Sequence, residues 1–155
     1  MDFKELLDQF ALDVGMTEPV AYEEEGLCHL DINDRDYGFS YVTEADRLVI
    51  WTAVCPRPPH SGDALLVQLL RANFIGQGMP DGALSLSEDD VIYAHCTLKM
   101  PIYDKTEFYE LLNRFVENVD NWRTMIDLAD RAREHIKKIR PDAPPPQEGE
   151  IRFDI

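Results

Sequence analysis

The side chains best suited to acid–base or nucleophilic chemistry in this chain are four histidines and three cysteines. Histidine changes its charge near neutral pH, and the histidines are His29, His60, His95 and His135. Cys28 directly precedes His29, and Cys96 directly follows His95, each pair in a stretch with strand-like alternation. Neighbouring residues of a strand point to opposite faces, so neither pair is arranged as a nucleophile and its base or as two ligands of one metal. We therefore expect ordinary histidines, no metal site and no cofactor.

Two acidic clusters and one glycine-rich loop are the remaining candidates for chemistry. Residues 23–25 and 88–90 are all acidic, but neither cluster has the ligand spacing of a calcium loop. The loop 76–82 follows an apolar segment instead of preceding a helix, and it lacks the Lys-Ser/Thr pair of a phosphate-binding loop. The sequence contains no serine elbow and no dinucleotide fingerprint. We predict that the protein is not an enzyme; a small hydrolase or metal enzyme using these acidic turns with His29 or His95 is an alternative.

The chain is strongly acidic. Its 155 residues include 30 acidic and 15 basic side chains, a net charge of −15, and residues 1–46 hold thirteen of the acidic residues against two basic ones. This charge disfavours binding to nucleic acid and to anionic membranes. The length suits one domain. The sequence shows no signal peptide and no apolar run of membrane-spanning length, and its scattered cysteines suggest buried thiols in a reducing compartment, so we expect a cytoplasmic protein.

Residues 61–76 are predicted to form a capped helix around which the fold is organised. Ser61 can accept a hydrogen bond at the first turn, Asp63 suits the positive end of the helix dipole, and Gly76 can end the helix. One wide face is apolar, made by Leu65, Leu66, Leu69, Leu70 and Phe74. A sheet covers one side of such a helix, so a second copy of the chain is the simplest cover for the other. A core helix inside a monomer is the alternative.

The rest of the sequence predicts an α+β fold. An amphipathic helix begins near Phe3; most of its apolar face is expected to pack on the core, and Phe3 and Phe10 are the side chains that could remain accessible. Alternating stretches over 27–32, 37–42 and 48–55, separated by turn residues, predict three antiparallel strands with the third in the centre. A second hairpin covers 82–87 and 91–100. A long helix starts near Asp104 with a capping-box pattern and runs to Ile139, with a break near Asp120 as the alternative.

The predicted order is thus helix, three strands, helix, two strands, helix, with a twisted antiparallel sheet flanked by helices. Residues 1–139 form the single domain, and the proline-rich residues 140–155 are predicted to be a disordered tail. Ile151, Phe153 and Ile155 alternate as in a short strand. A frayed tail and a strand added to another molecule are the two interpretations of that alternation.

Several strings of this sequence resemble a known family. They are LLRANF (residues 69–74), GALSLSEDDVIY (residues 82–93) and, in the long helix, FVENVDNWR (residues 115–123). Together with the order of the elements they resemble the class I type III secretion chaperones of the CesT and Tir-chaperone type. The resemblance covers roughly residues 1–138, and its specific part lies in the middle and towards the end. Met100-Pro101-Ile102 stands where many members are richer in leucine.

The resemblance implies a small, acidic, cytoplasmic homodimer without nucleotide or metal. Such a chaperone binds the N-terminal region of a secreted effector in a largely unfolded state and hands it to the secretion apparatus. The implied dimer interface consists of the apolar helix and the following strand, with Leu65, Leu66, Leu69, Leu70, Phe74, Leu84 and Leu86. The implied effector surface consists of Phe3, Leu7, Phe10, Leu30, Phe39, Tyr41 and Trp51. An adaptor or regulatory protein with the same fold, working outside secretion, is the alternative.

Overall fold

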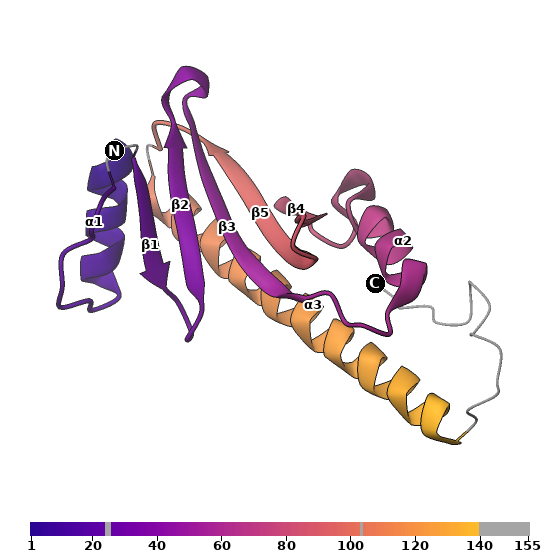
Figure 1. Ribbon diagram of the computed structural model, residues 1–155. Helices are drawn as coiled ribbons and strands as arrows, with labels where there is room; N and C mark the ends of the chain where they lie inside the picture. Colours follow the sequence, from indigo (N-terminus) through magenta and orange to yellow (C-terminus); the bar gives the residue numbers. More distant parts are fainter. Residues whose placement is uncertain (24–25, 103, 140–155) are drawn as a thin grey trace.

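One five-stranded antiparallel sheet and three helices make up the fold (Figure 1), in a computed structural model that describes residues 1–23, 26–102 and 104–139. The helices are α1 (Phe3–Asp13), α2 (Gly62–Ala72) and α3 (Lys105–Ile139). The strands are β1 (Leu27–Asp31), β2 (Asp36–Val42), β3 (Arg47–Pro56), β4 (Gly82–Leu86) and β5 (Val91–Lys99). The predicted element order is confirmed, and the sheet order β1-β2-β3-β5-β4 places β3 in the centre, as expected.

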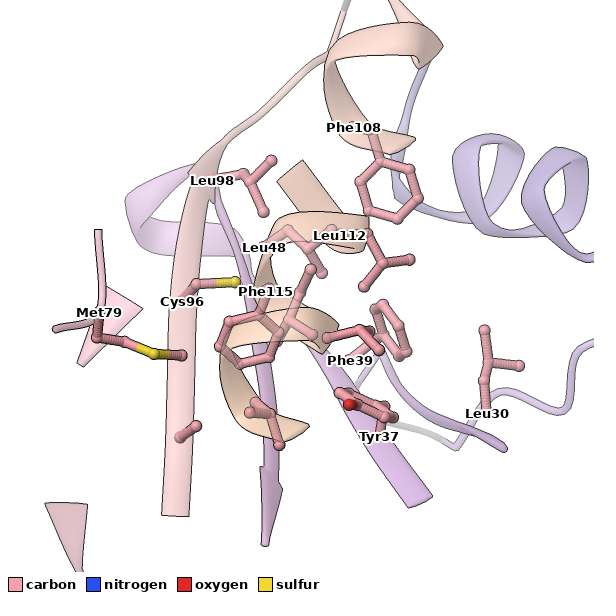
Figure 2. Close-up of a cluster of buried hydrophobic side chains, with 14 of the residues drawn as sticks. Leu30, Tyr37, Phe39, Leu48, Met79, Cys96, Leu98, Phe108, Leu112 and Phe115 are labelled. Atoms are coloured by element: carbon pink, nitrogen blue, oxygen red, sulfur yellow. The ribbon is translucent and has the colours of Figure 1, made fainter. Parts of the chain in front are cut away.

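The core lies between one face of the sheet and α3, which crosses that face diagonally and continues past it (Figure 1). Apolar side chains at every second position of β2, β3 and β5 point to this face because side chains alternate along a strand. They meet the apolar side of α3, and Figure 2 shows Phe108, Leu112 and Phe115 of α3 among Leu48 of β3 and Leu98 of β5. All of these side chains are buried. We call this side of the sheet the core face.

The first helix closes one end of the core face. Asp2 caps α1 by accepting a hydrogen bond from the Glu5 N–H at 2.9 Å. The ring of Phe10 packs edge-on against Phe108, with ring centroids 5.8 Å apart. At the end of α1 the carboxylate of Asp13 forms an ion pair of 2.8 Å with Lys105. These contacts fix α1 against the first turn of α3.

The second helix differs from its sequence prediction at both ends. Ser61 stands at the N-cap position but makes no capping bond, because its hydroxyl donates instead to the Pro58 carbonyl at 2.8 Å. The helix ends at Ala72, and a separate 3₁₀ turn, η2, spans Phe74–Gly76. Within that turn Ile75 has a φ of 54°, a conformation that a β-branched residue seldom adopts. The chain therefore leaves the helical path before the predicted glycine stop.

The second half of α3 runs beyond the sheet and supports α2. Residues of α2, among them Leu65, line a small cavity of about 20 Å³ together with Trp122 and Ile126 of α3. Trp122 also donates its indole N–H to the Gly78 carbonyl at 2.7 Å. The helix α3 continues through Asp120, so the alternative of a break there is wrong.

At the start of α3 the capping partner is Thr106, whose N–H donates to the Asp104 carboxylate at 2.8 Å.

The predicted tail, residues 140–155, lies outside the described residues. Each described helix is either too short or too polar to cross a membrane.

Candidate protein-binding surfaces

The histidines and cysteines are not assembled into a catalytic or metal site in the part of the chain that the structure describes. No group of three or more potential ligands from His, Cys, Asp and Glu lies close enough there to hold a metal ion. His29 Nδ1 lies 2.8 Å from the Asp36 carboxylate, but both side chains are exposed. Cys28 and Cys96 are buried, and this burial raises the pKa of each thiol to about 12. Such thiols are protonated at neutral pH and are poor nucleophiles.

The side of the sheet opposite the core face is the first candidate surface. The strand registers align one residue from each strand into a row across the sheet: His29, Gly38, Trp51, His95 and Ala83. Val49 and Tyr93 lie on the same side in the neighbouring rows. The rings of Trp51, Tyr93 and His95 are all partly exposed. We call the surface formed by His29, Val49, Trp51, Tyr93 and His95 the open face.

Trp51 is the centre of the open face. Its ring lies over Gly38, so close that a Cβ built on that glycine would overlap the indole. The indole packs edge-to-face with the ring of His29, with centroids 5.3 Å apart, and with the ring of Tyr93, with centroids 6.4 Å apart. Glycine at position 38 is therefore what allows the indole to lie across the neighbouring strand. The result is an apolar, aromatic surface with polar ring edges, a type of surface common in protein interfaces.

The structure corrects the predicted effector surface on α1. Phe3, Leu7 and Phe10 have exposed fractions of 5%, 0% and 9%, so they belong to the core of the single chain. The expectation that Phe3 and Phe10 stay partly accessible was wrong because α1 turns this side towards the sheet and α3. The exposed apolar residues at this end of the molecule are Leu12 and Val14.

The predicted effector residues of the first sheet are divided between the two faces. Leu30 and Phe39 point into the core, as Figure 2 shows, and both are buried. Tyr41 also lies on the core face, half-buried, and stacks on Phe3 with ring centroids 5.8 Å apart. Trp51 alone of this group lies on the open face. The alternation in the sequence predicted the spacing of these residues correctly. It did not show which of the two alternating sets of side chains faces α3.

The second candidate surface is the outer side of α2 and η2. Leu70, Phe74 and Ile75 are 72%, 62% and 83% exposed. The spacing of four residues between Leu66, Leu70 and Phe74 places them along one side of the helical turn, and Leu66 is half-buried. Leu86 of β4 is 37% exposed. This α2 surface consists of Leu66, Leu70, Phe74, Ile75 and Leu86.

Three residues of the predicted dimer interface face inward instead. Leu65, Leu69 and Leu84 are no more than 7% exposed and pack in the core of their own chain. Ile75 was not part of the apolar face predicted for the helix over residues 61–76. Its exposure comes from the 3₁₀ turn, which has no clear sequence signal.

Comparison with known proteins identifies the fold and the family. Among curated protein sequences none is similar enough to count as a relative. The sequence model of the Tir chaperone protein (CesT) family matches residues 5–123, which extends from α1 into the middle of α3.

Solved structures give the same answer for the fold. The structure of the ExsC–ExsE complex contains a chain of 18% identity with a TM-score of 0.69, covering 81% of this chain and 97% of that one. A chain of the HopA1–SchA chaperone–effector complex has 19% identity and a TM-score of 0.63, with 79% and 93% covered. The structure of the Yersinia pestis type III secretion chaperone SycH with a fragment of YscM2 contains a chain of 21% identity with a TM-score of 0.61. The match covers 76% of this chain and 97% of that one. With the family match over most of its length, this chain belongs to the Tir chaperone protein (CesT) family.

Proposed function

We propose that this protein is a type III secretion chaperone that acts in the cytoplasm as a homodimer and binds the N-terminal region of a secreted effector. The family match over residues 5–123 carries this proposal. Chaperone–effector complexes among the structures of the same fold support it. The chaperone keeps the bound segment unfolded and soluble until the secretion apparatus takes it.

The open face is the surface that we assign to the effector. An extended segment presents alternate side chains to one side, and apolar side chains placed against Trp51, Val49 and Tyr93 would remove apolar area from water. Each Å² so buried contributes roughly 25 cal/mol. Arg47 and Lys99 pair across β3 and β5 at the end of this face, so an acidic group next to the apolar residues would also be attracted.

The outer edges of the sheet are less available than the open face. On β1 an isolated bridge joins Tyr22 to Cys28, and the Glu23 N–H donates to the Leu27 carbonyl at 2.7 Å. On β4 the side chain of Asn73 bonds to both backbone groups of Leu84. An added effector strand would have to displace one of these partners. We therefore assign most of the affinity to side-chain burial on the open face.

The α2 surface is assigned to the second protomer. Leu70, Phe74 and Ile75 are highly exposed apolar side chains of α2 and η2, and α2 lies at the side of the sheet that is remote from α1 (Figure 1). In a two-fold dimer the α2 surface of each copy packs against the α2 surface of the other, so the apolar side chains of both copies are removed from water. Leu66 and Leu86 lie at the border of this interface, whereas Leu65, Leu69 and Leu84 support it from below.

Capture of partners from the native cells by tagged full-length protein tests the assignment of the open face. Trp51→Asp places a charge in its centre, and Leu12→Asp, at a residue that is 70% exposed on α1, is the matched control. We expect one partner to be captured by the wild type and by Leu12→Asp but lost with Trp51→Asp. Equal capture by Trp51→Asp would remove the open face from the effector site. The alternative, an adaptor outside secretion, predicts a captured partner that is not a secreted protein.

A further inference from the structure

A groove separate from both candidate surfaces lies where β3 continues past β2. The register of β2 with β3 runs from Val42 opposite Arg47 to Gly38 opposite Trp51, so the last residues of β3 extend beyond β2. Between this end of the strand and α3 is a groove of about 570 Å³. Its walls include Cys55, Pro58 and Pro59 on one side and Arg123, Leu128 and Arg131 on the other.

Basic side chains outnumber acidic ones in the lining of the groove, although the chain as a whole is acidic. Arg57, Arg123 and Arg131 line it together with Asp127 and Asp130. Arg131 is paired with Asp127 at 3.0 Å, and Arg57 lies 3.7 Å from Asp90. Arg123 has no ion-pair partner among the residues that the structure describes. Its guanidinium is available for an acidic group of an incoming segment.

An apolar stripe connects the groove to the end of α3. Leu128, Ile136 and Ile139 are 60%, 48% and 64% exposed, and Ala132 is exposed between them. Positions i, i+4, i+8 and i+11 share one side of a helix. The flanking sequence is basic, because residues 131–139 contain four Lys or Arg and one Glu. Apolar residues spaced in this way on an otherwise charged helix require a cover.

The chain itself contains a segment of complementary composition. Residues 141–155 carry four acidic side chains and one basic one. In an extended conformation Ile151, Phe153 and Ile155 would point to one side, and Glu150 and Asp154 adjoin them in the sequence. Apolar and acidic groups are the chemistry that the stripe and the groove can bind.

The length of the connecting segment also fits. Leu128 lies about 17 Å back along α3 from Ile139, at 1.5 Å per residue. Residues 140–146 include Pro141 and three consecutive prolines, and a proline-rich segment of seven residues could span up to about 22 Å at 3.1 Å per residue. A chain that turns back after α3 can therefore bring residues 147–155 over the stripe and the groove.

We propose that residues 147–155 dock back on their own chain, with Ile151, Phe153 and Ile155 against the Leu128 stripe and with acidic side chains towards Arg123. A short linker gives the docked segment an effective concentration of about the millimolar order. The intramolecular contact is thus favoured over the same contact between two copies. A protein whose exposed segment resembles this sequence would have to displace it.

Disulfide trapping in the full-length chain tests the docking. Cys55 lies in the groove and is partly exposed, whereas Cys28 and Cys96 are buried. Phe153→Cys supplies a second thiol in the tail, and Leu12→Cys supplies one on α1, which lies beside β1 on the far side of the sheet from α2 (Figure 1). In oxidised glutathione we expect an intramolecular disulfide between positions 55 and 153, formed at least about tenfold faster than any disulfide of the Leu12→Cys control.

Adding Leu128→Asp to the Phe153→Cys chain should slow the trapping about tenfold, because the charge replaces an apolar contact of the stripe. Trapping no faster than in the control, or unaffected by Leu128→Asp, would overturn the proposal. A disulfide that links two chains would assign the groove to the tail of another copy and would also overturn it.

A labelled peptide of residues 147–155 provides a test without cysteine chemistry. It should bind full-length Phe153→Asp, whose own tail is released, at least about tenfold more tightly than the wild type, whose tail competes. Equal affinity for the two proteins would contradict the docking.

Discussion

Asn73 and Leu84 are joined by two hydrogen bonds of 2.8 Å: the Asn73 amide donates to the Leu84 carbonyl, and its oxygen accepts from the Leu84 N–H. One side chain thus takes the place that a neighbouring strand would occupy along the free edge of β4. Replacing it with Ala would leave both backbone groups without these partners. We expect Asn73→Ala to lower the free energy of unfolding by about 1–3 kcal/mol.

Urea denaturation measures this cost, and Asn113→Ala is the matched control because Asn113 is exposed on α3. The account also predicts that Asn73→Ala self-associates more than the control, since an open strand edge pairs with other edges. A midpoint in urea equal to that of the control would show that these two hydrogen bonds do not stabilise the fold.

Gly38 is predicted to be intolerant of a side chain because of Trp51. The Cβ of Gly38→Ala would overlap the indole, and overpacking of this kind costs about 1–3 kcal/mol. The cost should largely disappear in the background Trp51→Ala, which removes the ring. A double-mutant cycle by urea denaturation measures the coupling. Additive costs would mean that the ring moves away freely and that its position over Gly38 is not a constraint.

The α2 surface predicts which leucines control assembly. Leu70→Asp should give folded monomers, because Leu70 is 72% exposed in the single chain and becomes buried only at the proposed dimer interface. Leu69→Asp should instead unfold the chain, because Leu69 is only 5% exposed and a buried charge without a partner is strongly destabilising. Light scattering gives the mass, and circular dichroism reports the fold. A dimer mass for Leu70→Asp, with Leu12→Asp as control, would refute this interface.

The contact between α1 and α3 predicts a pH dependence. Asp13 accepts hydrogen bonds from Lys105 at 2.8 Å, from Tyr109 at 2.7 Å and from Gln9 at 2.9 Å. These bonds hold its pKa at about 2, below the ordinary value of 3.8. Because the folded pKa is the lower one, the unfolded chain binds more protons between these values. The stabilisation is complete above about pH 4 and is lost as the pH falls towards 2.

Asp13→Asn should therefore lose less stability than the wild type when the pH is lowered through this window. Urea denaturation at about pH 6 and about pH 3 measures the difference. Asp89→Asn, in an exposed turn, should keep the pH dependence of the wild type. If Asp13→Asn shows the same pH dependence of stability as the wild type, the contacts of Asp13 are not its cause.

Much of the fold could be predicted from the sequence because local patterns determine it. The alternation around Phe39 and Ile50 gave the strands, and the regular spacing from Phe108 to Ile126 gave the long helix. The side-chain assignments were less successful, since alternation defines two faces without showing which one α3 covers. Phe39 and Trp51 were placed together in the sequence prediction, but they lie on opposite faces of the sheet. Leu69 and Leu70 were likewise grouped although only one is exposed.

The features that escaped prediction depend on tertiary contacts. The row from His29 through Trp51 to His95 requires the registers of three strand pairs, which a single sequence does not show. The turn at Ile75 forms against the local preference of the residue, because Asn73 and Gly78 are both held by other parts of the chain. The groove beside Arg123 arises from the different lengths of β2 and β3.

The most direct test of the chaperone account is limited proteolysis of the complex captured by the full-length protein from its native cells. Mass spectrometry identifies the protected fragment of the partner, and native mass spectrometry gives the stoichiometry. The account predicts one secreted partner, protected over a segment near its N-terminus, with two copies of this chain to one of the partner. Protection of a folded internal domain, in a partner that is not secreted, would contradict it.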